Sequence, residues 1–291
     1  MHELERLWIW QEADLKGRLS WYRRVSANQA PAKFRIARCV PVNLALEQAS
    51  EEDLWTALDE VTPRFLGLWE SVRRGSEDLP DPPDSHPDLV DLCRELTQRM
   101  LSHCNFCRWN CRVDRSRGMK FGTCKLAGES RVASYFHHQG EELIYFMSQP
   151  AMKILRVLMD IWLPDLKFGP GKCAVTLSRT PWYWETVTEN LKLIYEWGED
   201  FTIRHLVMPN HVECCTRPIL EWIAEVMPDV PVNLMDQYHP DNFCDPRSAK
   251  YDKQFVEIAR RPSKSEMMQA FRYARELGLR FEALSYEKNM T

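Results

Sequence analysis

The chain has 291 residues and a formal net charge of −4 at pH 7, with 44% hydrophobic and 27% charged residues, a composition typical of a globular protein with a sizeable core. This charge gives no electrostatic reason to expect a nucleic-acid partner, and no apolar run is long enough to span a membrane. Because the N-terminal residues are too charged for a signal peptide, we expect a cytoplasmic protein whose ten cysteines are not paired in disulfides.

Helical patterns begin at the N-terminus. Apolar residues at helical spacing predict one amphipathic helix over Leu4–Tyr22. Ser50 and Asp53 form a capping-box pattern that predicts the start of a second helix, which Pro63 is expected to interrupt. A third, short helix is predicted over Phe65–Val72, and the tryptophans along these helices are predicted to be core residues.

A linker and a further helix follow. The stretch Ser76–Asp88 is rich in proline and acidic residues and is predicted to be a linker. Pro87 stands where a helix can start, and the apolar stripe over Leu89–Met100 includes Cys93, which we expect to be a core thiol. Residues 1–102 are therefore predicted to form a helical extension.

Four of the ten cysteines lie in one short polar segment, with the spacing Cys-x2-Cys-x3-Cys-x12-Cys. Two thiolates separated by two residues can reach one metal ion from a tight turn, and the Arg and Lys residues nearby favour thiolates over thiols. We therefore predict a metal-binding segment over residues 103–147, with reduced, unligated thiols as the alternative. The predicted ligands are Cys104, Cys107, Cys111 and Cys124, and either His137 or His138 would add at most one more.

The remaining cysteines are predicted to add little. Cys214 and Cys215 are adjacent, and neighbouring thiols are not expected to chelate one ion together. Cys173 and Cys244 are predicted to lie in loops, with Cys244 only a weak metal candidate.

Short, largely apolar strands alternate with helices in the C-terminal half, which indicates a parallel sheet covered by helices. The predicted strands are Asp160–Phe168, Phe201–Met208, Val230–Tyr238 and Leu279–Leu284. The predicted helices follow Ser148 and Ser263 and cover Thr180–Gly198 and Thr216–Met227.

Polar side chains gather near the carboxyl ends of these strands, where parallel sheets bind their ligands. We expect a functional mouth at this edge, and the alternative is a set of ordinary capping and salt-bridged residues. The residues are Asp165, Lys167, Arg204, His205, Asn210, His211, Asp236, Gln237 and His239.

Two long parts of the chain, taken together, resemble one protein family. The run CNFCRWNCRVDRSRGMKFGTCKLAGESRVASYFHHQGEE resembles the amino-terminal cysteine segment of radical S-adenosylmethionine proteins related to the pyruvate formate-lyase activating enzyme. DIWLPDLKFG, IRHLVMP, VNLMDQYHP and EIARRPSKSEMMQAFRYARELGLRF resemble the carboxyl-terminal half of the same family. The resemblance implies an α/β fold: an incomplete (βα) barrel of about four parallel strands with helices over residues 148–291.

The family's defining Cys-x3-Cys-x2-Cys motif, which holds a four-iron cluster with one iron open for S-adenosylmethionine, does not occur in this sequence. Glu142 runs through LIYFMSQPAMKILRVLM directly into the first predicted strand, so we expect the first half of the barrel to be absent. Cys104, Cys107 and Cys111 have the motif's spacings in reverse order and are not assigned its radical-generating role.

The resemblance also implies cofactor-binding residues. Asp165, Lys167, Arg204 and His239 match positions that line the family's S-adenosylmethionine and substrate cleft. Asp165 would face the cationic amino or sulfonium group of the cofactor, and Arg204 would pair with its carboxylate in a bidentate fork.

Two functions remain open. The resemblance implies a radical S-adenosylmethionine iron–sulfur protein acting on a protein or a small molecule, impaired here, with a 4Fe-4S cluster on the four-cysteine segment. The alternative is a non-catalytic module in which zinc on those cysteines ties the helical extension to the half-barrel. A third possibility is a shortened remnant that a partner chain or a second copy completes, because the edges of a four-stranded parallel sheet need covering.

Overall fold

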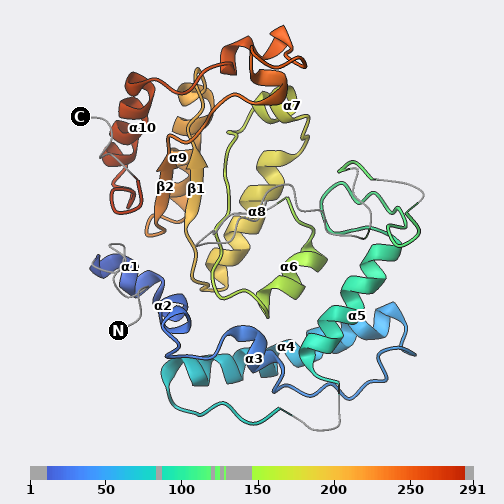
Figure 1. Ribbon diagram of the computed structural model, residues 1–291. Coiled ribbons are helices and arrows are strands. Elements are labelled where there is room, and N and C mark those ends of the chain that lie inside the picture. The colour runs from blue at the N-terminus through green and yellow to red at the C-terminus, as the bar shows by residue number, and fades with distance from the viewer. Residues whose placement is uncertain (1–11, 83–86, 119–121, 125–127, 129–145, 286–291) are drawn as a thin grey trace.

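The computed structural model describes residues 12–82, 87–118, 122–124, 128 and 146–285, and it shows a mostly helical chain around a small parallel sheet (Figure 1). The N-terminal helices are α1 (Ala13–Arg18), α2 (Ser20–Ser26), α3 (Lys33–Ala37), α4 (Glu51–Arg74) and α5 (Leu89–Ser102). The C-terminal half contains α6 (Gln149–Arg156), α7 (Cys173–Ser178), α8 (Tyr183–Glu196), β1 (Ile203–Leu206), the π-helical turn η3 (Val212–Thr216), α9 (Arg217–Val226), β2 (Val232–Met235), the 3-10 turns η4 (Asn242–Cys244) and η5 (Lys253–Ile258), and α10 (Lys264–Glu276). No helix in the described part of the chain combines the length and the apolar character needed to cross a membrane.

The helix α4 is continuous, so the predicted break at Pro63 is wrong. Its start is confirmed, because Ser50 and Asp53 form the reciprocal capping box. Buried residues continue along one face on both sides of the proline, from Leu54 to Val72, and this packing favours one helix over two.

The first predicted helix is divided in two, and its residues 4–11 lie outside the described chain. The break falls at Leu19, whose φ of −108° and ψ of 35° are not helical. Leu19 packs with Ile161, whereas Trp21 belongs to the N-terminal core and donates a hydrogen bond to Asp160 (2.8 Å). The break therefore lies where Leu19 and Tyr22 pack against Ile161 while Trp21 turns into the N-terminal core.

The sheet keeps the predicted parallel order, but only two of its four segments are regular strands. β1 and β2 pair in parallel, with Ile203 opposite Val232. The flanking segments form isolated parallel bridges: Trp162 with Phe201, Asp165 with Arg204, and Pro231 with Arg280. Proline in a strand removes a ladder hydrogen bond, and Pro164 lies between the first two bridges. The described residues therefore form a two-stranded parallel sheet and no barrel, which corrects the predicted four-stranded half-barrel.

Two hydrophobic cores support this architecture. One is formed by the helices α3, α4 and α5, and the other by the sheet with α8, α9 and α10. α6 contributes to both, since Met152 is buried in the second core while Ala151 and Ile154 are buried in the first. α6 therefore joins the predicted helical extension to the predicted α/β region.

Buried charges hold the N-terminal helices against the amino ends of the parallel segments. Lys33 and Glu199 form an ion pair of 2.5 Å with side chains that are 0% and 1% exposed. The Lys33 backbone N–H also donates to Asp160 (2.9 Å). This edge of the sheet is therefore a structural joint, which leaves the carboxyl edge for function.

Candidate metal centre

Four potential ligands converge just beyond the carboxyl ends of β1 and of the segment that runs beside it. Cys173, His211, Cys214 and Cys215, called here the CHCC cluster, have ligand atoms that all lie within 4.8 Å of one another. The Cys173 Sγ atom is 3.6 Å from both Cys214 Sγ and His211 Nδ1, and Nδ1 is 3.2 Å from Cys214 Sγ. A zinc tetrahedron with Zn–S bonds of about 2.3 Å and a Zn–N bond of about 2.0 Å has S–S edges of about 3.8 Å and S–N edges of about 3.5 Å. The cluster could therefore hold one metal ion with only small movements.

The π-helical turn η3 explains how two adjacent cysteines reach one point. The Thr216 N–H bonds to the His211 carbonyl at 3.2 Å, the wide i→i+5 pattern that defines this turn. In this wider turn, successive side chains differ less in direction around the helix axis than they do in an α-helix. Cys214 is exposed and Cys215 is buried, yet both belong to the CHCC cluster. Both neighbouring thiols thus reach one cluster, and the expectation that they do not chelate one ion together stays a prediction.

Gly169 lets the segment before Cys173 lie directly against this turn. A Cβ atom at Gly169 would stand 2.6 Å from the Cys214 carbonyl oxygen and 2.9 Å from Cys215 Cα, so only glycine fits without a backbone shift. The Gly169 backbone N–H donates to Cys215, which favours the thiolate, while burial raises the pKa of that thiol more strongly. The close approach thus brings Cys173 to the other ligands.

His211 has the environment of a metal-ligating imidazole. Its Nδ1 atom faces the sulfurs, while its Nε2 atom is buried, has no hydrogen-bond partner among the described residues and lies 3.6 Å from a carboxylate oxygen of Glu257. Metal-bound histidines commonly turn their second nitrogen to a carboxylate, which fixes the ring. Burial lowers the pKa of His211, although Glu257 and Glu266 oppose this, and the neutral imidazole that results is the form that binds metal.

Asn210 fixes the backbone just before His211. Its φ of 65° lies in the left-handed region, which asparagine tolerates better than most residues. Its backbone N–H donates to Glu266 (2.6 Å), its side-chain amide donates to the Glu257 carbonyl (2.6 Å), and Arg260 donates to its Oδ1 (3.0 Å). This network connects the ligand turn to η5 and α10.

The predicted four-cysteine segment has a different geometry. Arg115 donates to Cys124 Sγ at 3.1 Å and to Cys104, so one guanidinium holds the first and last cysteine together. Cys111 accepts a bond from the Thr123 N–H, which lowers the pKa of its thiol. The ligand group found among the described residues does not include these four cysteines, although the charges of the other three add to burial in raising the pKa of Cys107.

The second half of the segment returns closely onto the first. Cys107 accepts a hydrogen bond from the Trp109 N–H, but burial raises the pKa of its thiol. A Cβ atom at Gly122 would stand 3.0 Å from Cys111 Sγ and 2.9 Å from Arg115 Nη2. The metal site predicted at Cys104, Cys107, Cys111 and Cys124 stays a prediction, and His137 and His138 lie outside the described residues.

Three of the residues assigned by resemblance to cofactor binding lie together, but their charged groups pair with one another. Asp165 is 6% exposed; its Oδ1 accepts two bonds of 2.7 Å from Arg204, and its Oδ2 pairs with Lys167 at 2.9 Å. The carboxylate has both oxygens engaged, so the residues as they stand do not present a free group for an S-adenosylmethionine ammonium or sulfonium. His239 is exposed, and no contact with this triad is seen in the described chain.

The other polar residues of the predicted mouth divide into two groups. His211 and Asn210 belong to the CHCC cluster and its support, as shown above. His205 is fully buried; its ring nitrogens lie 2.6 Å from the Leu166 carbonyl and 2.9 Å from Thr216 Oγ1, so its assignment to the mouth is wrong. Asp236 and Gln237 are exposed after β2.

The chain is similar in sequence to a protein of an archaeon. An uncharacterized protein of Methanocaldococcus jannaschii is 24% identical over 353 aligned residues, which cover 90% of this chain and 98% of the relative. No family model matches the chain. Because the alignment is longer than the 291-residue chain, it contains stretches of the relative that have no counterpart here.

Proposed function

We propose that this chain is a zinc-binding protein in which one Zn²⁺ at the CHCC cluster locks the turn η3 to the first residue of α7. The observation that carries this proposal is the set of three ligand separations, 3.6, 3.6 and 3.2 Å, which approach the edges of a zinc tetrahedron. Four protein ligands leave no open coordination position, so the role of the ion is structural.

Cobalt titration tests this proposal. Co²⁺ in a tetrahedral site with three thiolates gives intense sulfur-to-metal charge-transfer absorption, and zinc then displaces it. We expect this signal in the full chain and the loss of one bound cobalt ion, with its share of the absorption, in Cys214→Ser. Cys244→Ser is the matched control, because Cys244 lies outside the cluster. A signal that survives Cys214→Ser unchanged would reject the assignment.

The resemblance supports a second proposal about ancestry. The chain would descend from a radical S-adenosylmethionine protein of the pyruvate formate-lyase activating enzyme type that lost the part of the barrel with the catalytic cluster. The alignment with the longer archaeal relative supports a loss of internal sequence. We assign no radical step to this chain, because the Asp165 carboxylate is already neutralised by Arg204 and Lys167.

The four-cysteine segment would then hold a separate centre, either an iron–sulfur cluster or zinc. An iron–sulfur cluster would take these thiolates on different irons, whereas zinc would take all four on one ion. Anaerobic reconstitution with iron and sulfide, followed by absorption and EPR spectroscopy, tests this. A colourless product with no reducible cluster would reject it. Light scattering of the reconstituted protein would also show whether a second copy completes the sheet.

A further inference from the structure

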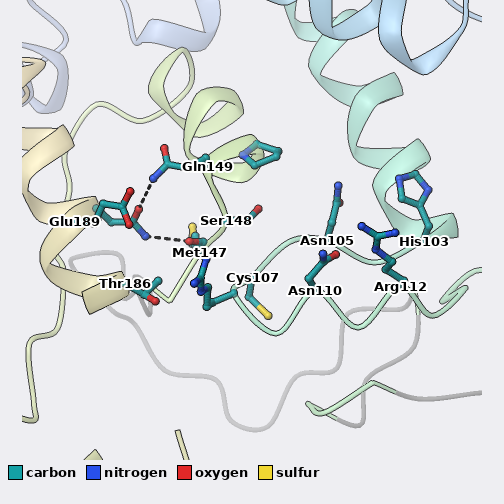
Figure 2. A pocket seen from close by; sticks show the side chains of 13 residues that line it. His103, Asn105, Cys107, Asn110, Arg112, Met147, Ser148, Gln149, Thr186 and Glu189 are labelled. Atoms are coloured by element: carbon teal, nitrogen blue, oxygen red, sulfur yellow. Dashed lines mark hydrogen bonds between the residues drawn. The ribbon is translucent and has the colours of Figure 1, made fainter. Parts of the chain in front are cut away.

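A cavity of about 650 Å³ lies between the four-cysteine segment, the start of α6 and one face of α8 (Figure 2). Backbone pairing holds the two segments beside it together. Cys107 and Met147 form an antiparallel bridge, the Arg108 N–H donates to the Phe146 carbonyl (3.1 Å), and the Ser148 N–H donates to the Phe106 carbonyl (3.1 Å). Small-molecule sites commonly have volumes of about 300–1,000 Å³. The cavity therefore suits an organic ligand rather than a bare inorganic ion.

The charge on the cavity wall is mainly positive. Arg108 and Arg112 both line it, and neither forms an ion pair with a carboxylate among the described residues. His103 is held by Glu51 at 3.2 Å. Among the described residues of the wall, the acidic one is Glu189, on the opposite side from Arg112 in Figure 2. Two unneutralised guanidinium groups favour a carboxylate or a phosphate, which they can bind in a bidentate fashion.

Uncharged polar groups complete the wall. Asn105 and Asn110 lie beside Arg112 in Figure 2, and Gln149 lies across the cavity from them. The Asn105 Oδ1 atom is buried and has no hydrogen-bond partner in the described chain. Because that atom is closed to solvent, the amides that a ligand could reach are those of Asn110 and Gln149, which are exposed.

The backbone beneath this wall is held in an unfavourable conformation. Asn110 and Arg112 have φ values of 43° and 52°, in the left-handed region. The bonds from Asn110 N–H to the Cys107 carbonyl (3.0 Å) and from Arg112 N–H to the Cys104 carbonyl (2.9 Å) keep them there. Strained residues of this kind gather at binding sites, where they aim side chains at a ligand.

From these observations we infer that the cavity binds a small organic anion, a carboxylate or phosphate ester whose body also carries hydroxyl groups. The anionic group lies against the exposed guanidinium groups of Arg108 and Arg112, and a hydroxyl group of the ligand lies against the amide of Asn110 or Gln149. This site is separate from the CHCC cluster, so it does not depend on zinc binding there.

Isothermal titration calorimetry of the full chain at low ionic strength tests the inference. Citrate represents the hydroxylated carboxylates and glucose 6-phosphate the phosphate esters, and whichever binds identifies the source of the anion. Glucose lacks the charge and inorganic phosphate lacks the hydroxylated body, so both should bind far more weakly. Arg112→Asn, which removes the charge but tolerates the left-handed backbone, should weaken binding roughly ten- to a hundredfold.

Arg179→Asn is the matched control, because Arg179 is also left-handed, with a φ of 53°, and does not line the cavity. It should bind the ligand like the original chain. If Arg112→Asn does not fold, Arg108→Gln removes the neighbouring charge instead. The inference is overturned if neither organic anion binds at millimolar concentration, if both cavity variants bind normally, or if inorganic phosphate binds as well as glucose 6-phosphate.

Discussion

The contact between Gly169 and η3 allows a stringent test of the CHCC cluster. In Gly169→Ala the new Cβ atom would meet the Cys214 carbonyl oxygen at 2.6 Å and Cys215 Cα at 2.9 Å, and both are backbone atoms that cannot rotate away. Overpacking of this kind costs about 1–3 kcal/mol. The backbone must then shift to relieve these contacts. If this shift moves Cys173 away from the other ligands, the dissociation constant for zinc should rise roughly 5- to 150-fold.

Competition with a chromophoric zinc chelator measures this constant, and urea denaturation with and without zinc measures the stability. Gly171→Ala is the matched control, since a Cβ atom there meets nothing within 4 Å. We expect Gly171→Ala to bind zinc normally. If Gly169→Ala and Gly171→Ala have the same zinc affinity, the close approach does not position the ligands and the reasoning fails.

Three further predictions concern the surroundings of the cluster and the joint at the other edge. Glu257→Gln should weaken zinc binding about 10–100-fold by removing the carboxylate that faces His211, and normal affinity in the chelator competition would contradict this role. Burial lowers the pKa of His205 from 6.5 to about 4, so its contribution to stability is present above pH 6.5 and is lost as the pH falls toward 4. Urea denaturation should show that His205→Gln removes about 3 kcal/mol of this pH dependence, and an unchanged profile would argue against the buried neutral ring. Lys33→Met should cost about 3–5 kcal/mol in the same assay by leaving Glu199 charged and buried, and the further change Glu199→Gln should restore most of that loss.

The sequence predicts helix starts well because capping depends on residues that are neighbours in the chain. Ser263 and Glu266 form the predicted capping box of α10, as Ser50 and Asp53 do for α4. Features that depend on distant packing are predicted less well. The buried stripe of α4 carries the helix through Pro63, and Pro164 interrupts a segment whose apolar pattern predicts a regular strand.

In the candidate site, too, the sequence predicts the features that depend on neighbouring residues better than those that depend on distant packing. Parallel-sheet topology predicts a functional mouth at the carboxyl edge, and His211 is among the residues that it selects. Cys214 and Cys215 are set aside on sequence because adjacent thiols are not expected to chelate one ion together, and the π turn that brings both to one point is seen only in the structure. Cys173 joins them only because Gly169 permits a backbone approach from a distant segment. The spacing His-x2-Cys-Cys directly after a predicted strand is the signal that points to this cluster.

Anomalous diffraction at the zinc edge, on crystals of the full chain grown with zinc, tests the central claim most directly. We expect a peak between Cys173, His211, Cys214 and Cys215, about 2.3 Å from each sulfur and about 2.0 Å from Nδ1 of the histidine. Reduced, unligated thiols at these four positions, with no zinc peak between them, would contradict it.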